Sequence, residues 1–405
     1  MENNLFQILG IRNSSDSKKI AEEIGVENEY LRYLNENRLL PTGTVLEKIC
    51  KKANIDETVL KLMLGIIDQT VIELLIKNAK SISSMVTSGK LNKEIKNVME
   101  PVMSTPLGKL YCGDCIDLLS TMPDETVDLV FADPPFNLNK LYPSKIDDNL
   151  KSEKYLQWCE QWLHECCRVL KYGGSLFTWN LPKWNTYIST FLNHRLTFRH
   201  WISVDIKYSL PIQSRLYPSH YSLLYYCKGE KPSKFHPDRL PMEVCPKCAD
   251  DLVDYGGYKD KMNPMGVNLS DVWYDIPPVR HSKYKARKDA NELSIKLLDR
   301  IIELSTDEGD LVFDPFGGSG TTYIVSEIKK RKWIGIEIGP VDDIVKRFEA
   351  INEEREYLNS FRENLNTLFT ADTLKKRISK KLWTCESVRE RKNKKDSDIQ
   401  IGLFS

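Results

Sequence analysis

The chain has 405 residues, of which 41% are hydrophobic and 28% are charged, as in ordinary globular proteins of two or three domains. No window approaches the ~18 consecutive apolar residues of a membrane span. The first residues, "MENNLFQILG", also lack the basic and apolar regions of a signal peptide. We therefore expect a cytoplasmic protein without a membrane partner, in which the ten cysteines are mostly free thiols.

Basic residues gather in two segments, although the formal net charge is only +1. Ten Lys or Arg and two Glu occur from Lys375 to Lys395, and seven Lys or Arg and three acids occur from Arg280 to Arg300. Such clusters often contact phosphates, and a solvated helix face is the alternative.

Residues 1–65 predict a small all-α domain. Two apolar helical faces are formed by Ile20, Ala21, Ile24, Leu31 and Leu34. Gly25 supplies a sharp turn between them, and this pattern resembles the helix-turn-helix of the Cro/repressor family. Glu27 and Glu29 open the second helix and would repel phosphates, so DNA binding and a helical interaction or dimerisation module both stay open.

The pattern after this domain predicts an α/β fold. Residues 66–106 begin as an amphipathic helix and become a linker rich in Ser, Gly and Pro. Strand-like and helix-like runs then alternate over residues 107–227 and 282–355, which predicts a mostly parallel sheet with helices on both faces. Residues 228–281 interrupt the alternation as a polar insert suited to recognition, and residues 356–405 read as a helical basic tail.

The run "FADPPFN" ends the first of these strands. "VDLVF" reads as a buried strand, so Asp133 stands where the chain leaves the sheet. Pro134 and Pro135 fix φ and remove two backbone donors, which makes the following corner rigid, and Phe136 presents a ring beyond it. Ligands of parallel α/β sheets bind at this place, outside the carboxyl ends of the strands.

The run "DLVFDPFGGSGTT" forms a second strand end with a glycine-rich loop. A P-loop is excluded, because no Gly-Lys-Ser/Thr sequence follows. Glu337 ends the next strand, where a carboxylate can accept a hydrogen bond from a ribose hydroxyl. The loop and the acid together indicate a nucleoside ligand without a demanding phosphate group.

The two loops together resemble those of the S-adenosylmethionine-dependent amino-methyltransferases of DNA. The "DPPFN" motif precedes a variable region and the "DPFGGSGTT" motif, which is the order of the β class. The resemblance covers residues 107–355 and extends to "LYCGDCIDLL" and "YSLLYYCKG". It implies a Rossmann-like, doubly wound, mostly parallel sheet in circularly permuted order, with S-adenosylmethionine as the cofactor.

The resemblance also implies the roles of individual residues. Asp133 and the Pro134 carbonyl would accept the hydrogens of an exocyclic amine, Pro135 would keep the loop rigid, and Phe136 would stack on the flipped base. The residues expected against the cofactor are Asp114 and Glu337 on its adenosine, and Asp314, Pro315, Phe316, Gly317 and Gly318 on its methionine and sulfonium. For Asp114, a loop-capping acid is the alternative.

The implied activity is site-specific methylation of duplex DNA in a restriction-modification system. An Asp ahead of Pro-Pro is typical of adenine-N6 enzymes, and cytosine N4 is the alternative base. The alternative of another class is a DNA-binding transcriptional regulator with a non-catalytic methyltransferase-like domain. Duplex DNA, a cognate restriction endonuclease and a second copy of the chain are the candidate partners.

Two weaker patterns lie in and beside the insert. Cys245 and Cys248 form half of a zinc site, for which Cys227 and His236 are candidate partners, and free thiols in a recognition loop are the alternative. The candidate phosphate contacts mix basic residues with one tyrosine: Arg280, Lys283, Tyr284, Lys285, Arg287 and Lys288. We expect the insert and these residues to set the methylated sequence, and the N-terminal 65 residues not to set it.

Overall fold

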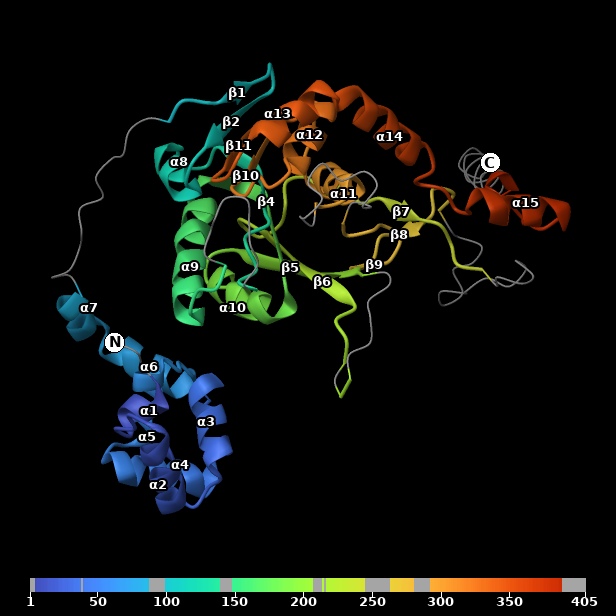
Figure 1. Ribbon diagram of the computed structural model, residues 1–405. Helices are drawn as coiled ribbons and strands as arrows, with labels where there is room; N and C mark the ends of the chain where they lie inside the picture. Colours follow the sequence, from blue (N-terminus) through green and yellow to red (C-terminus); the bar gives the residue numbers. More distant parts are fainter. Residues whose placement is uncertain are drawn as a thin grey trace, which may run out of the picture. The chain divides into compact units, whose positions relative to one another are not determined.

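The computed structural model describes residues 4–37, 39–86, 99–138, 148–206, 213–214, 216–244, 263–279 and 292–387. The chain divides into two compact units, Met1–Glu94 and Ile95–Ser405, which are coloured blue and cyan-to-red in Figure 1. Among the described helices, none combines the length and the apolar composition that crossing a membrane requires.

The first unit is all-α. Its helices are α1 (Leu5–Ile8), α2 (Ser14–Ile24), α3 (Asn28–Asn37), α4 (Gly43–Ala53), α5 (Glu57–Leu64), α6 (Gln69–Lys77) and α7 (Ala79–Val86). Gly25 ends α2 with φ +75° and donates its N–H to the carbonyl of Ala21, which is the turn expected between the two helices. The helical part extends further than the sequence predicted, because α7 includes most of the Ser-rich run that we assigned to a linker.

The second unit is built on a large sheet. The described strands pair in the order β1-β2-β11-β10-β3-β4-β6-β5-β9. Their bounds are β1 (Met103–Ser104), β2 (Gly108–Cys112), β3 (Val127–Ala132), β4 (Leu170–Asn180), β5 (Thr197–Asp205), β6 (His220–Cys227), β9 (Val272–Trp273), β10 (Leu311–Asp314) and β11 (Lys332–Glu337). Strands β2, β11, β10, β3 and β4 are parallel neighbours, and β6 joins β4 in antiparallel orientation.

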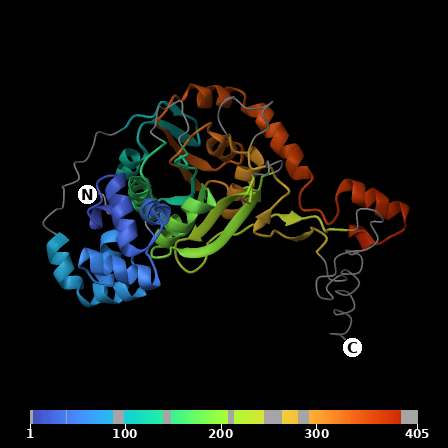
Figure 2. The ribbon, with the colours of Figure 1, turned by 60° about the horizontal axis from the view of Figure 1, so that its bottom comes forward.

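Helices cover both faces of this sheet (Figures 1 and 2). One face carries α8 (Cys115–Thr121), α9 (Ser152–Val169) and α10 (Pro182–Leu192), and the other carries α11 (Ile295–Ser305), α12 (Thr321–Ile328) and α14 (Ile351–Glu363). Strand β3 contributes to both cores, because Leu129 and Phe131 face the second set of helices while Val130 and Ala132 face the first. The doubly wound, mostly parallel α/β sheet predicted from the sequence is confirmed.

Two further helices and a two-stranded sheet are also described in this unit. They are α13 (Asp342–Glu349), α15 (Ala371–Ser379), and the pair of strands β7 (Arg239–Leu240) and β8 (Val267–Asn268). The predicted boundary at residue 355 falls inside α14, so the tail is continuous with a helix that packs on the core. The insert is also less separate than expected, because its strand β9 pairs with β5 in the main sheet.

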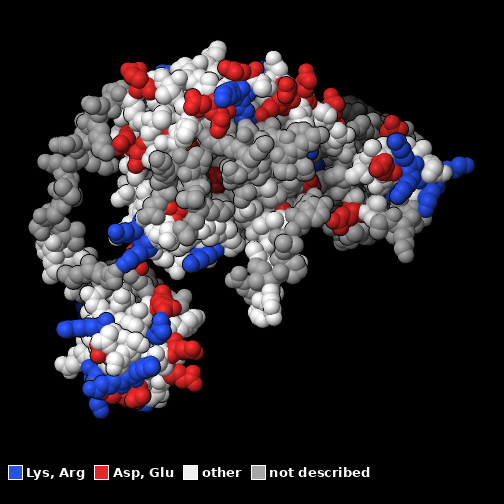
Figure 3. All heavy atoms as spheres, viewed as in Figure 1, with Lys and Arg blue, Asp and Glu red and all other residues white. Residues whose placement is uncertain are grey.

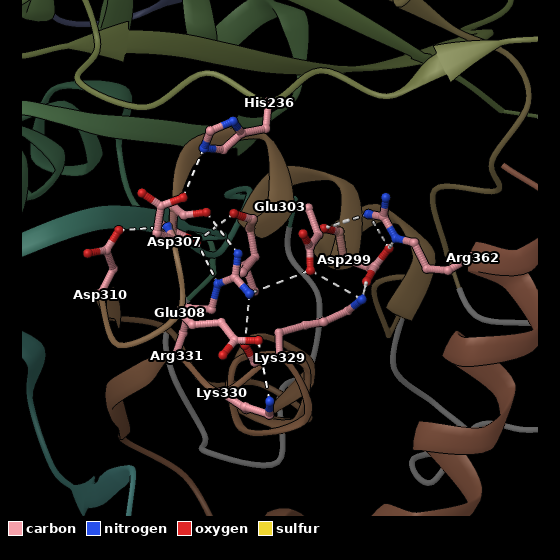
Figure 4. Close-up of polar contacts among 12 residues, drawn as sticks. His236, Asp299, Glu303, Asp307, Glu308, Asp310, Lys329, Lys330, Arg331 and Arg362 are labelled. Carbon is pink, nitrogen blue, oxygen red and sulfur yellow. Dashed lines mark hydrogen bonds and ion pairs between the residues drawn. The ribbon is translucent and has the colours of Figure 1, made fainter. Parts of the chain in front are cut away.

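Ion pairs connect the start of the insert to the helices beside it (Figure 4). Arg362 on α14 contacts Asp238 and Asp299, each at 2.5 Å. Both acids are buried, and Asp299 also pairs with Lys329 at 3.0 Å. Desolvation makes such charges stable only while they are paired, so these contacts hold the packing of α11, α14 and the insert together.

Replacing Arg362 with Met should therefore destabilise the second unit. The variant removes the guanidinium that pairs with the buried carboxylates of Asp238 and Asp299. We expect the free energy of unfolding to fall by roughly 3 kcal/mol. Chemical denaturation measures this loss. The matched control is Lys330→Met, since Lys330 and Glu308 form a pair whose side chains are 71% and 65% exposed. It should cost less than about 0.5 kcal/mol, and equal losses in the two variants would contradict the assignment.

Candidate functional site

Four acidic residues stand at or just after the carboxyl ends of four neighbouring strands, which meet at one edge of the sheet. Strands β2, β11, β10 and β3 lie side by side in parallel, and their carboxyl ends lead to Asp114, Glu337, Asp314 and Asp133 respectively. The register pairs Cys112 with Glu337 across β2 and β11. The topology thus brings the two loops predicted from the sequence, 133–137 and 314–320, to adjacent strand ends, where α/β sheets bind ligands.

The loop after β3 is held through its carbonyls. The Tyr155 hydroxyl donates to the Pro135 carbonyl at 2.7 Å, and the Trp184 indole N–H donates to the Phe136 carbonyl at 2.7 Å. Since a proline has no backbone N–H, carbonyls are the polar groups by which residues 134 and 135 can be anchored. Among the described residues, no donor contacts the carbonyl of Pro134, which leaves it as an acceptor beside Asp133.

Asn137 closes this loop. It adopts the left-handed region, with φ +53°, and its side chain exchanges two hydrogen bonds with the backbone of Leu150. Its N–H and that of Leu138 both donate to the carboxylate of the buried Asp148, at 2.7 and 2.9 Å. A carboxylate that accepts two backbone N–H groups fixes the end of the loop.

Tyr221 on β6 is a neighbour that the sequence did not single out. Its ring centroid lies 6.3 Å from that of Phe136 and 5.0 Å from that of Trp179. Burial, and secondarily the charge of Asp133, raises the pKa of Tyr221. Phe136 and Tyr221 thus form an aromatic wall beside the carboxylate of Asp133, as a site for a planar ring requires.

The glycine-rich loop after β10 is organised by Asp314. Its carboxylate is buried and accepts hydrogen bonds from the Phe316 N–H at 2.9 Å and from the Thr322 hydroxyl at 2.5 Å. Desolvation by burial outweighs these two bonds and raises the pKa of Asp314 to about 7. A Cβ at Gly317 would come within 2.8 Å of the Tyr323 hydroxyl, so only glycine permits this close approach of the backbone.

Phe316, in the same loop, packs against two tryptophans of α9. Its ring centroid lies 5.1 Å from that of Trp162 and 5.6 Å from that of Trp158. The latter ring also contacts Tyr155, at 5.9 Å. Helix α9 therefore packs against both loops.

Glu337 and Asp114 both bind backbone N–H groups. Glu337 accepts the N–H of Gly318 at 2.6 Å and the N–H of Gly339 at 2.8 Å, so its carboxylate connects the end of β11 to the glycine-rich loop. Asp114 caps α8 by accepting the N–H of Ile116 at 2.8 Å. This cap is the alternative that we stated for Asp114, and its contact with a ligand stays a prediction.

Arg347 on α13 supports the far side of the glycine-rich loop. Its guanidinium donates to the Ser319 carbonyl and to the Thr321 hydroxyl, both at 2.8 Å. It also binds both carboxylate oxygens of Glu354, at 2.7 and 2.9 Å. Neither residue could be found from the sequence, since a buried Arg–Glu pair has no local signature.

The other predicted site residues fall into two groups. Cys245 and Cys248, and the six candidate phosphate contacts Arg280, Lys283, Tyr284, Lys285, Arg287 and Lys288, lie outside the described residues. Cys227 is buried in β6 and lies 3.6 Å from the Gly229 carbonyl, whereas His236 is exposed and contacts Asp307 at 3.0 Å. The described residues contain no group of three or more His, Cys, Asp or Glu that could hold a metal ion.

Only some of the basic side chains in the described part of the tail are exposed to solvent. Lys375, Lys376, Lys380 and Lys381 are largely exposed on and after α15, where Figure 3 shows Lys and Arg side chains gathered. Arg377 is buried instead, and its guanidinium lies over the rings of Phe369 and Trp383 at 4.5 and 4.7 Å. It therefore packs against aromatic rings and is not available to a phosphate.

The raised pKa of Asp314 predicts a pH-dependent stability. The unfolded carboxyl loses its proton near its ordinary pKa of 3.8, whereas the folded one keeps it until about 7. The stabilisation from this proton is complete below about pH 4 and is lost as the pH rises through about 7. Asp314→Asn removes this loss, so the unfolding free energy of the variant minus that of the wild type should increase over this window. A pH series of chemical denaturation measures it, and a pH-independent difference would contradict the burial argument.

Comparison with known proteins gives the family. A family model described as DNA methylase matches residues 127–345. The Type II methyltransferase M.BamHI of Bacillus amyloliquefaciens is 46% identical over 398 residues, which cover 95% of this chain and 94% of that protein. The DNA adenine methyltransferase YhdJ of Escherichia coli (strain K12) is 33% identical over 231 residues, covering 56% of this chain and 76% of that protein.

Among solved structures, the PvuII DNA methyltransferase (cytosine-N4-specific) has a TM-score of 0.46 at 21% identity, with 64% of this chain and 95% of that chain covered. The matched family segment includes both the "DPPFN" loop and the "DPFGGSGTT" loop. The chain therefore belongs to the DNA methylase family and is a β-class amino-methyltransferase.

Proposed function

We propose that the protein transfers a methyl group from S-adenosylmethionine to an exocyclic amine of a base in duplex DNA. The observation that carries this proposal is the adjacency of β3 and β10, which pair in parallel and lead into the Asp133 loop and the glycine-rich loop. An amine bound at the first loop and a methyl donor bound at the second would lie next to each other. Such an alignment of two reactants is a large part of catalysis.

The residues at the cofactor side fit S-adenosylmethionine. Asp114, Glu337 and the neighbouring Asp133 provide carboxylates that suit a ligand with a sulfonium, an ammonium group and ribose hydroxyls, and that disfavour a phosphate. Gly317 and Gly318 carry no side chain that would stand between the backbone of the loop and the cofactor. When bound, S-adenosylmethionine supplies an electrophilic methyl group to the site.

The residues of the Asp133 loop then act on the amine. Its lone pair is delocalised into the aromatic ring, so the enzyme must accept its hydrogens and align the nitrogen with the methyl group. Asp133 accepts one N–H and the Pro134 carbonyl accepts the other, while Phe136 and Tyr221 contact the faces or edges of the base. The amine reaches this site only after the base has been flipped out of the duplex.

We propose adenine N6 as the target, because an Asp ahead of Pro-Pro is typical of adenine enzymes. Cytosine N4 is the alternative, since cytosine presents the same two hydrogens to Asp133 and Pro134. Nucleoside analysis by mass spectrometry of DNA methylated by the purified protein distinguishes them, with DNA treated with Asp133→Ala as the blank. N6-methyl-2′-deoxyadenosine is the expected product. N4-methylcytosine would overturn the base assignment, and no methylated base would favour a non-catalytic DNA-binding regulator.

The two loops should separate by mutation. Asp133→Ala should abolish turnover and keep cofactor binding, because the acid acts on the amine. Gly318→Asp should weaken cofactor binding by at least about tenfold, because it places a second carboxylate next to Glu337, which accepts the Gly318 N–H at 2.6 Å. Calorimetric titration with S-adenosylhomocysteine measures the affinity. Asp372→Ala, an exposed acid on α15, is the control. Equal loss of affinity in both loop variants would contradict the separation of roles.

We further propose that duplex DNA is bound by the insert and by residues 280–288, and that a cognate restriction endonuclease accompanies the enzyme. Zinc bound by Cys245 and Cys248 remains a candidate cofactor of the insert. The family and the M.BamHI relative support a restriction-modification setting. The N-terminal unit would not set the methylated sequence, because Glu27 and Glu29 stand at the start of its α3 and repel phosphates. It would at most add affinity or mediate dimers.

Deleting residues 1–94 should leave the methylated sequence unchanged. This deletion follows the boundary between the two units and keeps Met99 and β1, which pack and pair with the sheet. Turnover should fall only at low DNA concentration, if the N-terminal unit raises the effective concentration of DNA. Sequencing of methylated sites on a plasmid, with full-length protein as the control, measures the specificity. A different or relaxed site in the truncated enzyme would show the assignment to be wrong.

A further inference from the structure

The backbone of the Asp133 loop is anchored by two buried donors on helices α9 and α10. Tyr155 donates to the Pro135 carbonyl and Trp184 to the Phe136 carbonyl, both at 2.7 Å. The two rings also pack against each other, with centroids 4.7 Å apart. Tyr155 is 1% exposed and Trp184 4%, so neither bond competes with bulk water.

Asn180, the last residue of β4, sets the direction of the Tyr155 hydrogen bond. Its Oδ1 accepts the N–H of Leu181 at 2.7 Å, so its Nδ2 is the atom that faces the Tyr155 oxygen, at 3.1 Å. Because that amide donates to the tyrosine oxygen, the hydroxyl proton points to the Pro135 carbonyl. Burial raises the pKa of Tyr155, so the hydroxyl keeps this proton in neutral solution.

These bonds leave the Pro134 carbonyl of the loop as an acceptor for a ligand. The carbonyls of Pro135 and Phe136 are occupied, and Asn137 is clamped to Asp148 and Leu150. Among the described residues, no donor contacts the Pro134 carbonyl. The orientation of each peptide plane limits that of the next, so fixing the Pro135 and Phe136 carbonyls restricts the directions open to the Pro134 carbonyl and the Phe136 ring.

We propose that Tyr155, with Asn180 behind it, and Trp184 are positioning residues of the methyl transfer. They touch neither amine nor cofactor, and they act by holding the Pro134 carbonyl and Phe136 in the geometry that receives the base. This inference rests on the proposed function of the Asp133 loop. It assigns a catalytic consequence to residues that their burial alone would class as core.

The test removes single hydrogen bonds and keeps the rings or the side-chain shape. Tyr155→Phe and Trp184→Phe should each lower kcat by about tenfold to hundredfold, with the Kd for S-adenosylhomocysteine and the KM for DNA within about twofold of wild type. Asn180→Asp replaces the donor to Tyr155 with an acceptor, which turns the hydroxyl away from Pro135. It should lower kcat to a similar extent, and the Tyr155→Phe/Asn180→Asp double variant should be no slower than the single variants.

The matched control is Tyr226→Phe. Tyr226 on β6 is equally buried, and its hydroxyl donates to Asn193 Oδ1 at 2.7 Å, away from the loop. If Tyr155 only stabilised the core, Tyr155→Phe and Tyr226→Phe would have the same effect on kcat. We expect instead that Tyr226→Phe loses a comparable amount of thermal stability and keeps an unchanged kcat.

Two results would overturn the inference. A wild-type kcat in folded Tyr155→Phe and Trp184→Phe would show that the anchors do not matter, and a fall in kcat that follows only the folded fraction or cofactor affinity would assign them to the core. If the wild type is active and both variants match its kcat, this inference alone is refuted. A wild type without any methylated product would refute the proposed function, and the inference with it.

Discussion

The parallel pairing of β10 between β3 and β11 is the constraint on which the site depends. Val312 pairs with Leu129 on one side, and Asp314 pairs with Gly335 on the other. Because the side chains of a strand alternate between two faces, a shift by one residue would turn the apolar residues of β10 away from their cores. The register thus places the loop after Asp314 beside the loop after Ala132, although long stretches of chain separate them.

Crowding acids at one edge of the sheet has an electrostatic cost that the backbone offsets. Three of these carboxylates each accept at least one backbone N–H: Asp314 from Phe316, Glu337 from Gly318 and Gly339, and Asp114 from Ile116. The two donors to Asp314 favour its ionised form, whereas its burial favours the neutral one and raises its pKa. The raised pKa of Asp314 therefore limits its repulsion with Glu337 at the glycine-rich loop.

The fold and the two loops could be predicted from the sequence because their signals are local. In "VDLVFADPPFN" a short apolar run is followed by prolines, and in "DLVFDPFGGSGTT" a similar run is followed by glycines. Prolines and glycines after an apolar run mark the end of a strand. The anchors of the loops could not be predicted in this way. In a helical pattern Tyr155 is only a buried aromatic, and its bond to Pro135 depends on tertiary packing.

The same limit applies to the ion pairs of the insert. Arg300 on α11 binds the carboxylate of Asp275 through both terminal nitrogens, at 2.9 and 2.5 Å, and also contacts Asp238 at 3.3 Å. A count of charges along residues 280–300 places Arg300 in a basic cluster for phosphates, whereas the structure buries it between two acids. Net charge along the chain does not tell which cations are already paired.

A crystal structure of the protein with S-adenosylhomocysteine would test most directly whether the adjacent ends of β3 and β10 form one reaction site. We predict that the sulfur lies between the glycine-rich loop and Asp133, with the ribose at Glu337 and the adenine toward Asp114. A ligand bound away from these strand ends, or with its sulfur turned away from Asp133, would contradict this description of the enzyme.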